Sequence, residues 1–176
     1  MTIVRLLLAG VIVALSIWLG RVKSMKLAER VRALSGFLEM ARYLEVKIRV
    51  GGFALPDALE ECAHRFAGRW TGSYAGALSA LYRAQSPSRG LWLAALKGLK
   101  GSEEPLALAE EDCQMIALFG DQLAGSDLRA IAENYSFLYS RMEERIQLAE
   151  KDSKVRGKLF RTVGTLAGLA IAIAIT

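Results

Sequence analysis

Two cysteines, one histidine and a short acidic run are the residues of this chain whose types could carry out chemistry. Cys62 and Cys113 are far apart in the sequence, and both fall on expected helices at positions typical of small core residues. His64 follows Cys62 by two residues, and on a helix this spacing points the two side chains apart. A single histidine excludes a histidine-based metal cluster, and two cysteines exclude a disulfide scaffold. We therefore expect no catalytic residue, cofactor or metal; a membrane-tethered enzyme that uses Cys62 or the acidic run is the alternative.

The acidic run and a glycine-containing stretch do not have the spacing of a known catalytic motif. Glu110, Glu111 and Asp112 follow one another, which is typical of a solvated helix face. Residues 98–102 read Gly-Leu-Lys-Gly-Ser, but they lack the glycine spacing of a phosphate-binding loop and a preceding strand. We therefore do not expect nucleotide binding.

The charges in the middle of the chain are segregated by sign. From Cys62 to Ser102 every charged residue is basic, and from Glu103 to Leu128 every charged residue is acidic. Two interpretations are open: the two stretches face each other within one bundle, or they attract a charged partner or a second copy of the chain. In the second interpretation, the residues expected to bind an acidic partner are Arg83, Arg89, Lys97 and Lys100, and those expected to bind a basic partner are Glu103, Glu110 and Glu111.

These side chains must be positioned by helices, because helical periodicity runs through the middle of the chain and strand-like alternation does not occur. Apolar residues recur every three or four positions, and glycine and proline punctuate them; Gly72 is expected to separate two helices, and Pro105 to open one. The expected helices are residues 27–48, 56–66, 74–82, 90–100, 105–123 and a last one of nearly 50 residues from 127 onward. The sequence therefore predicts an all-α bundle of about six helices.

The two ends of the chain are its most apolar segments. Residues 6–20 and 163–176 contain no charge, and helices over residues 2–20 and 159–176 are about 28 and 27 Å long, close to the thickness of a bilayer core. We expect a transmembrane helix at residues 1–20, a cytosolic helical bundle at 21–158 and a second transmembrane helix at 159–176. A cleaved signal peptide and a buried helix of a soluble domain are the alternatives for the first segment.

The flanks of the apolar segments predict the orientation of the chain. Basic residues follow the first segment and precede the second: Arg21, Lys23, Lys26, Arg30, Arg32, Lys151, Lys154, Arg156, Lys158 and Arg161. The positive-inside rule then places the bundle in the cytoplasm and both termini on the far side of the cell membrane.

Gly164 and Gly168 have the spacing with which two membrane helices pack closely, or they face lipid. The formal net charge of +5 is too modest to imply nucleic acid.

Several short motifs, in this order and spacing, resemble the stage III sporulation protein AB family. They are Leu44-Glu45-x-x-Ile48, Leu55-Pro56-x-Ala58-Leu59, Phe119-Gly120-Asp121-Gln122-Leu123 and Lys158-Leu159-Phe160-x-x-Val163-Gly164-x-Leu166-x-Gly168-Leu169. The last one is the most specific. The chain departs from the family pattern at several positions: Lys47 stands where the family has an acid, Pro56 follows Leu55 rather than preceding a leucine, and Ala124 and Ile131 stand where the family has glycine and usually glutamine.

The resemblance implies a role in the channel-like apparatus that joins mother cell and forespore. The family's cytosolic part looks like the helical domain of type II secretion and type IV pilus platform proteins, which couple a cytosolic ATPase to assembly in the membrane. By this analogy the chain is a non-enzymatic platform subunit. Its partners are then the sporulation ATPase, stage III protein AA, other membrane subunits of the channel complex, and another copy of itself in a homo-oligomer. A pilus or secretion platform adaptor unrelated to sporulation is the alternative.

Overall fold

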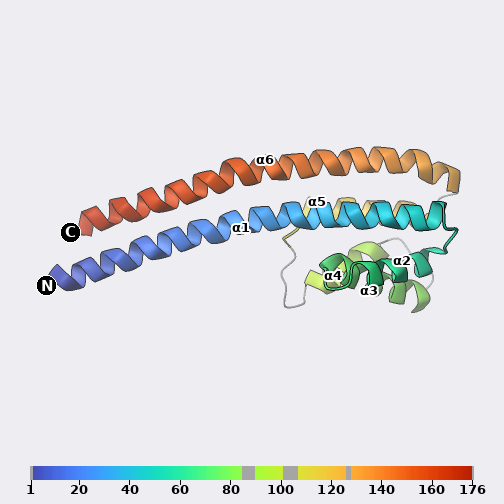
Figure 1. The fold of residues 1–176 in the computed structure, drawn as a ribbon, viewed down its shortest axis with the longest axis horizontal. Helices are drawn as coiled ribbons and strands as arrows, with labels where there is room; N and C mark the ends of the chain where they lie inside the picture. Colours follow the sequence, from blue (N-terminus) through green and yellow to red (C-terminus); the bar gives the residue numbers. More distant parts are fainter. Residues whose placement is uncertain (1, 85–89, 101–106, 126–127, 176) are drawn as a thin grey trace. The chain divides into compact units, whose positions relative to one another are not determined.

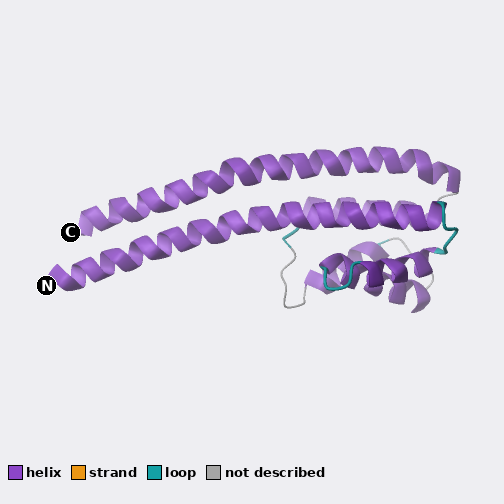
Figure 2. Ribbon diagram, in the orientation of Figure 1, coloured by secondary structure: helices purple, strands orange, loops and turns teal. Residues whose placement is uncertain are grey.

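The computed structural model describes residues 2–84, 90–100, 107–125 and 128–175, and within these ranges every regular element is an α-helix (Figures 1 and 2). This confirms the all-α class. The six helices of the described residues are α1 (Thr2–Arg49), α2 (Leu55–Arg65), α3 (Trp70–Ala84), α4 (Leu91–Lys100), α5 (Glu110–Gly125) and α6 (Leu128–Ile175).

The predicted break at Gly72 is wrong, because α3 already begins at Trp70 and contains Gly72 in its first turn. Gly72 is buried, and a Cβ atom at this position would lie 2.3 Å from the carbonyl oxygen of Phe66. The glycine therefore allows the backbone before α3 to approach the helix closely. Gly52 and Gly68, in contrast, lie between helices and have positive φ angles of 67° and 78°.

The predicted start of the fifth helix at Pro105 is also wrong. Pro105 lies outside the described residues, residues 107–109 are not helical, and α5 begins at Glu110. The carboxylate of Asp112 accepts a hydrogen bond of 3.0 Å from the backbone N–H of Ala109, as in a capping box. The acidic run thus lies in the first turn of α5, where negative charge is favoured by the helix dipole.

The last helix has the predicted length and spans 48 residues without a break at Gly157. Gly157 is buried, and a Cβ atom added there would lie 3.0 Å from the hydroxyl oxygen of Ser24, which is also buried. Two small residues therefore allow α1 and α6 to lie side by side at this level.

The chain divides into two compact units. Unit 1 contains residues Met1–Val31 and Gln147–Thr176, so it is built from one part of α1 and one part of α6. Unit 2, Arg32–Ile146, contains the rest of both helices together with α2 to α5.

Unit 2 holds the hydrophobic core. Among the side chains that the structure describes, the largest fully buried ones are Trp92, Tyr74, Phe37, Phe119, Leu34, Met40, Leu44, Leu59, Leu78, Leu96, Ile116 and Met142. Aromatic rings connect α1, α3, α4 and α5, with centroid distances of 6.3 Å from Phe37 to Tyr74, 5.8 Å from Tyr74 to Trp92 and 6.0 Å from Trp92 to Phe119. Such edge-to-face and tilted pairs add to the hydrophobic stabilisation of the core.

Over the part of the chain that the structure describes, none of the helices has a run that is both long and apolar enough for a bilayer crossing. The structure thus does not support the two transmembrane helices expected at residues 1–20 and 159–176. Many positions of both segments, including Gly164 and Gly168, lie outside the residues whose side chains are described.

Candidate partner-docking surface

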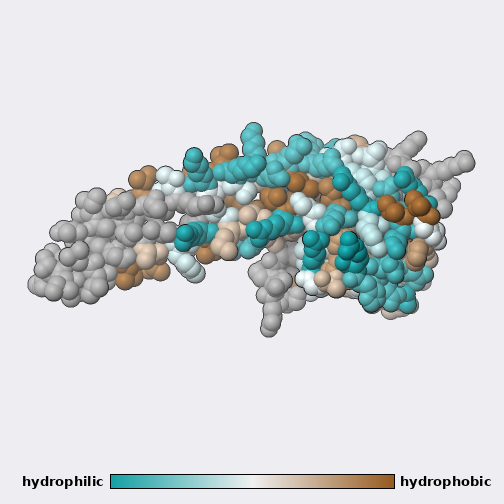
Figure 3. Space-filling view, viewed as in Figure 1, coloured by the Kyte–Doolittle hydropathy of each residue, from teal (hydrophilic) through white to brown (hydrophobic). Residues whose placement is uncertain are grey.

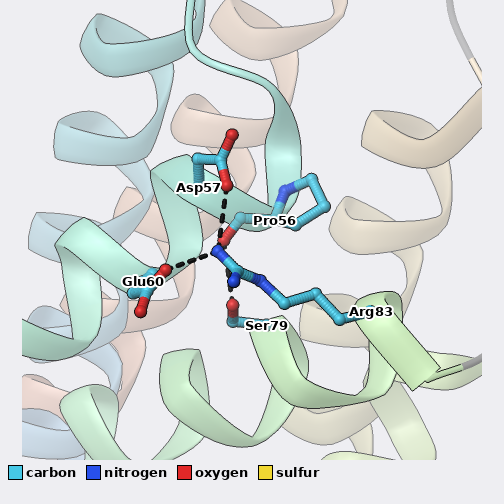
Figure 4. A network of polar contacts seen from close by, with 5 residues as sticks. All are labelled: Pro56, Asp57, Glu60, Ser79 and Arg83. Atoms are coloured by element: carbon cyan, nitrogen blue, oxygen red, sulfur yellow. Dashed lines mark hydrogen bonds and ion pairs between the residues drawn. The ribbon is translucent and has the colours of Figure 1, made fainter.

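Arg83, one of the expected docking residues, forms ion pairs within unit 2. It lies in the last turn of α3, and its guanidinium group donates a hydrogen bond of 2.9 Å to Asp57 and another to Glu60, both on α2 (Figure 4). One turn earlier, the Ser79 hydroxyl donates a hydrogen bond of 2.9 Å to the carbonyl oxygen of Pro56. Arg83 therefore connects α3 to the start of α2, although each of these half-exposed ion pairs contributes only about 0–1 kcal/mol.

Lys97 is the expected basic docking residue that is most available to a partner. It lies on α4, its side chain is exposed, and the described residues supply no ion pair for it. Lys100 ends α4, but its side chain lies outside the described part of the structure, as does the whole of Arg89. Arg65, at the end of α2, is a second exposed cation with no ion pair among the described residues.

The expected acidic docking residues lie at the start of α5. Glu110 and Glu111 are exposed, whereas the neighbouring Asp112 is fully buried. The guanidinium group of Arg145, on α6, donates a hydrogen bond of 2.7 Å to Glu111 and another of 3.4 Å to Asp112. Glu103 lies outside the described residues. The acidic run is thus part of a contact between α5 and α6.

The ion pairs bear on the two interpretations of the segregated charges. In the basic stretch, Arg69 donates a hydrogen bond of 2.7 Å to Glu39 on α1, and Arg83 pairs with α2. In the acidic stretch, Glu111 pairs with Arg145 of α6. These three described side chains therefore each pair with a third region of unit 2 rather than with the oppositely charged stretch.

The Leu44-Glu45-x-x-Ile48 motif places a carboxylate against α6. The Tyr139 hydroxyl donates a hydrogen bond of 2.9 Å to Glu45 and lies 3.2 Å from the carbonyl oxygen of Ala41. Burial, and then the hydrogen bond to Glu45, raise the pKa of Tyr139. Tyr139 and Glu45 lie far apart in the chain, so local sequence patterns do not predict their contact.

The Phe119-Gly120-Asp121 motif organises the contact between α5 and α4. A Cβ atom at Gly120 would lie 1.8 Å from the Trp92 ring, so only glycine leaves room for the indole. Asp121 accepts a hydrogen bond of 3.0 Å from the backbone N–H of Gly90, just before α4 begins. Phe119 packs edge-on against Trp92. In this structure the motif stabilises the fold.

The candidate nucleophiles are core residues, as their helical positions predicted. Cys62 and Cys113 are both buried and unpaired. Burial raises the pKa of Cys62 to about 12, while the nearby Lys47 lowers it by a smaller amount. His64 is exposed on α2, in the turn that follows Cys62. Cys62 is therefore a protonated thiol at neutral pH, which makes it a poor nucleophile.

An exposed apolar patch lies at the end of α1 and was not predicted. Val46, Val50 and Phe53 keep 52%, 75% and 40% of their surface exposed, and the first two are one helical turn apart. The Lys47 ammonium group lies 5.0 Å from the centre of the Phe53 ring and 5.4 Å from that of Tyr43. Hydrophobic surface near the end of α1 stands among hydrophilic surroundings (Figure 3). The patch is apolar surface of the kind that interfaces use.

The geometry defines an all-α domain whose motif residues support its helix contacts. The family model of stage III sporulation protein AB matches residues 5–176, nearly the whole chain. The chain therefore belongs to the stage III sporulation protein AB family, which confirms the resemblance and supports a sporulation-related role. No curated protein and no solved structure matches the chain.

Proposed function

We propose that this protein is a non-enzymatic platform subunit of a secretion-like sporulation channel, attached to the mother-cell membrane through both of its ends. In this proposal the apolar ends enter the bilayer, both termini lie outside, and unit 2 faces the cytoplasm. Unit 2 then docks the sporulation ATPase, stage III protein AA, and other membrane subunits of the complex. The proposal rests on family membership and on the apolar ends of the sequence.

The division of the chain is consistent with this proposal, because both ends belong to one compact unit and the described core belongs to the other. In the proposal, unit 1 attaches to the membrane and unit 2 docks the partners. Residues 6–20 and 163–176 carry no charge, which is the composition that a bilayer interior requires. Gly164 and Gly168 would pack the two membrane segments together.

The docking surface that we propose is centred on α4. Lys97 is exposed there without an ion pair among the described residues, and Lys100 follows it three positions later. Arg83 is a weaker candidate than its sequence position indicated, because it already pairs with Asp57 and Glu60. An acidic surface on the ATPase would be attracted to free cations more than to paired ones.

A pull-down of the sporulation ATPase by the full-length protein in detergent tests the docking surface. We expect the double variant Lys97→Glu, Lys100→Glu to bind the ATPase at least about tenfold more weakly, because two attractive charges become repulsive. The matched control is Arg65→Glu, an exposed cation of the same basic stretch that is outside the proposed surface. Equal binding by all three proteins would exclude the α4 surface.

The membrane attachment is tested separately by fractionating sporulating cells. We expect the protein to sediment with membranes until detergent is added. Protease supplied from outside intact cells should leave unit 2 undigested. Recovery of the protein in the supernatant without detergent would overturn the attachment, and digestion of unit 2 from outside would overturn the orientation.

A further inference from the structure

The positive charge of this protein is concentrated in unit 1. Unit 1 contains ten Lys and Arg residues but only three Asp and Glu residues, whereas unit 2 contains thirteen and fifteen. The formal net charges are therefore +7 for unit 1 and −2 for unit 2, which together give the +5 of the whole chain. The modest total thus conceals a strongly basic region that is built from the two ends of the chain.

Four cations of unit 1 are exposed and have no ion pair among the described residues. They are Arg21 and Lys26 on α1, and Lys151 and Lys158 on α6. We name these four residues the basic collar. Lys154 and Arg156 are also exposed, but they pair weakly with acids one turn away, at 3.8 and 3.3 Å.

The close approach of Ser24 on α1 to Gly157 on α6 shows which residues of the two helices lie at the same height. Arg21 and Lys26 lie within one helical turn of Ser24, and Lys158 directly follows Gly157. Three cations from two helices therefore lie near one level of unit 1, and Lys151 lies nearly two turns from Gly157 along α6. Repulsion between like charges at one level is costly unless counter-charges cover them.

Exposed apolar side chains lie beside the collar on both helices. Trp18 and Met25 on α1 are 62% and 60% exposed, and Val155 and Leu159 on α6 are 58% and 56% exposed. Hydrophobic surface is visible on both helices toward the chain ends, and hydrophilic surface follows it along them (Figure 3). This combination of cations with exposed apolar groups matches the boundary between lipid headgroups and acyl chains.

We propose that the basic collar binds the phosphate groups of anionic phospholipids, so that unit 1 selects an anionic membrane surface. The Lys and Arg side chains would extend to the headgroups, while Trp18, Met25, Val155 and Leu159 contact the acyl-chain boundary. Each Lys or Arg near an anionic membrane surface strengthens binding to that surface about fivefold. Four such cations together therefore make the protein strongly selective for anionic membranes. This inference rests on the membrane attachment of the proposed function and adds the class of lipid.

Lipid retention by the full-length protein tests the collar. The protein is extracted with detergent from vesicles of phosphatidylcholine mixed with phosphatidylglycerol, and the lipids that remain bound are quantified by mass spectrometry. We expect retained lipid to be enriched in phosphatidylglycerol at least about fivefold over the vesicle composition. In the variant Arg21→Gln, Lys26→Gln, Lys151→Gln, Lys158→Gln the retained lipid should approach the vesicle composition.

A matched control removes four exposed cations of unit 2: Arg32→Gln, Arg65→Gln, Lys97→Gln and Arg141→Gln. It changes the net charge by the same amount, and we expect it to keep the enrichment of the unaltered protein. If the collar variant and the unaltered protein are equally enriched in phosphatidylglycerol, lipid binding by the basic collar is excluded, but membrane attachment of the protein is not. The four cations would then be available to a protein partner instead. A protein that never enters the vesicles would overturn the proposed attachment itself.

Discussion

At the scale of single residues, Gly120 shows how one position determines a helix contact. The Trp92 indole fills the space in which any other residue at position 120 would place its Cβ atom. Trp92 is fully buried, and its ring nitrogen donates a hydrogen bond of 3.0 Å to the Tyr82 hydroxyl. The Tyr74 hydroxyl donates one of 3.0 Å to the carbonyl oxygen of Trp92. The indole is thus fixed on several sides and has no room to move away.

We therefore expect Gly120→Ala to destabilise the protein by about 3 kcal/mol, the upper part of the usual cost of an overpacked core. The measurement is the urea unfolding midpoint of the full-length protein in detergent, followed by tryptophan fluorescence. Gly98→Ala is the matched control, because Gly98 is exposed on α4 and a Cβ atom there meets nothing within 4 Å. That control should stabilise the protein by about 0.5–1 kcal/mol. Equal midpoints for the two variants would contradict the close Trp92 contact.

Cys62 leads to a prediction of pH dependence. Its folded pKa is raised to about 12 from an ordinary value of 9.0, so the folded protein holds the thiol proton where the unfolded chain releases it. The stabilisation from this group is therefore complete below pH 9 and is lost as the pH rises from about 9 to 12. At pH 8 we expect iodoacetamide to label Cys62 only after unfolding by urea. Rapid labelling of the folded protein at pH 8 would show a reactive thiol and revive the enzyme alternative.

At the scale of helices, Asp112 determines where α5 begins. Its side chain is buried, accepts a hydrogen bond from the Ala109 backbone N–H and lies 3.4 Å from Arg145. The neighbouring Glu111 also pairs with Arg145, but its side chain is 73% exposed. The two acids differ in burial and in the capping bond, and they share the same cation.

We expect Asp112→Ala to destabilise the protein by about 2 kcal/mol, because it removes a helix cap and the polar partner of a buried contact. Glu111→Gln should cost only about 0.5 kcal/mol, the usual contribution of an exposed ion pair. Urea unfolding followed by circular dichroism compares the two variants. A larger loss for Glu111→Gln would mean that the ion pair, rather than the cap, stabilises the start of α5.

The predicted helix boundaries are right where the apolar periodicity is strong, and wrong where contacts between distant residues determine where a helix begins. The length of α6 and the end of α1 before Gly51 followed from apolar spacing and from glycine. Glycine at position 72 predicts a helix break, but its role comes from the close approach of Phe66, which the local sequence does not indicate. Proline at position 105 predicts a helix start, whereas α5 begins at Glu110, where the Asp112 side chain accepts a hydrogen bond from the Ala109 backbone N–H.

The candidate site was predictable in its residue types but not in its pairings. The sequence identified Arg83, Glu110 and Glu111 as charged and exposed, and all three are exposed in the structure. It did not identify Asp57, Glu60 or Arg145 as their partners, because ion pairs between helices depend on how those helices pack. Only the unpaired Lys97 retains its predicted availability among the described basic docking residues.

At the scale of the whole molecule, the two units differ in the forces that stabilise them. Among the side chains that the structure describes, the twelve largest fully buried ones all belong to unit 2, so unit 2 contains a hydrophobic core of its own. Unit 1 contains instead the strongly basic parts of α1 and α6 and exposed apolar side chains along both helices. A domain that contains its own hydrophobic core can fold alone when a fragment includes the whole domain.

We therefore expect a fragment of residues 32–146 to fold alone, with one cooperative urea transition, and to remain in the supernatant of a membrane preparation in which the full chain sediments. A fragment of residues 32–115 is the control, since it lacks Ile116, Phe119 and Met142 and so should not unfold cooperatively. Circular dichroism and sedimentation measure both properties. A 32–146 fragment without a cooperative transition would show that unit 2 requires the continuous helices of unit 1. A folded fragment that still sediments with membranes would instead place membrane binding in unit 2, where the net charge of −2 gives no attraction to anionic lipid.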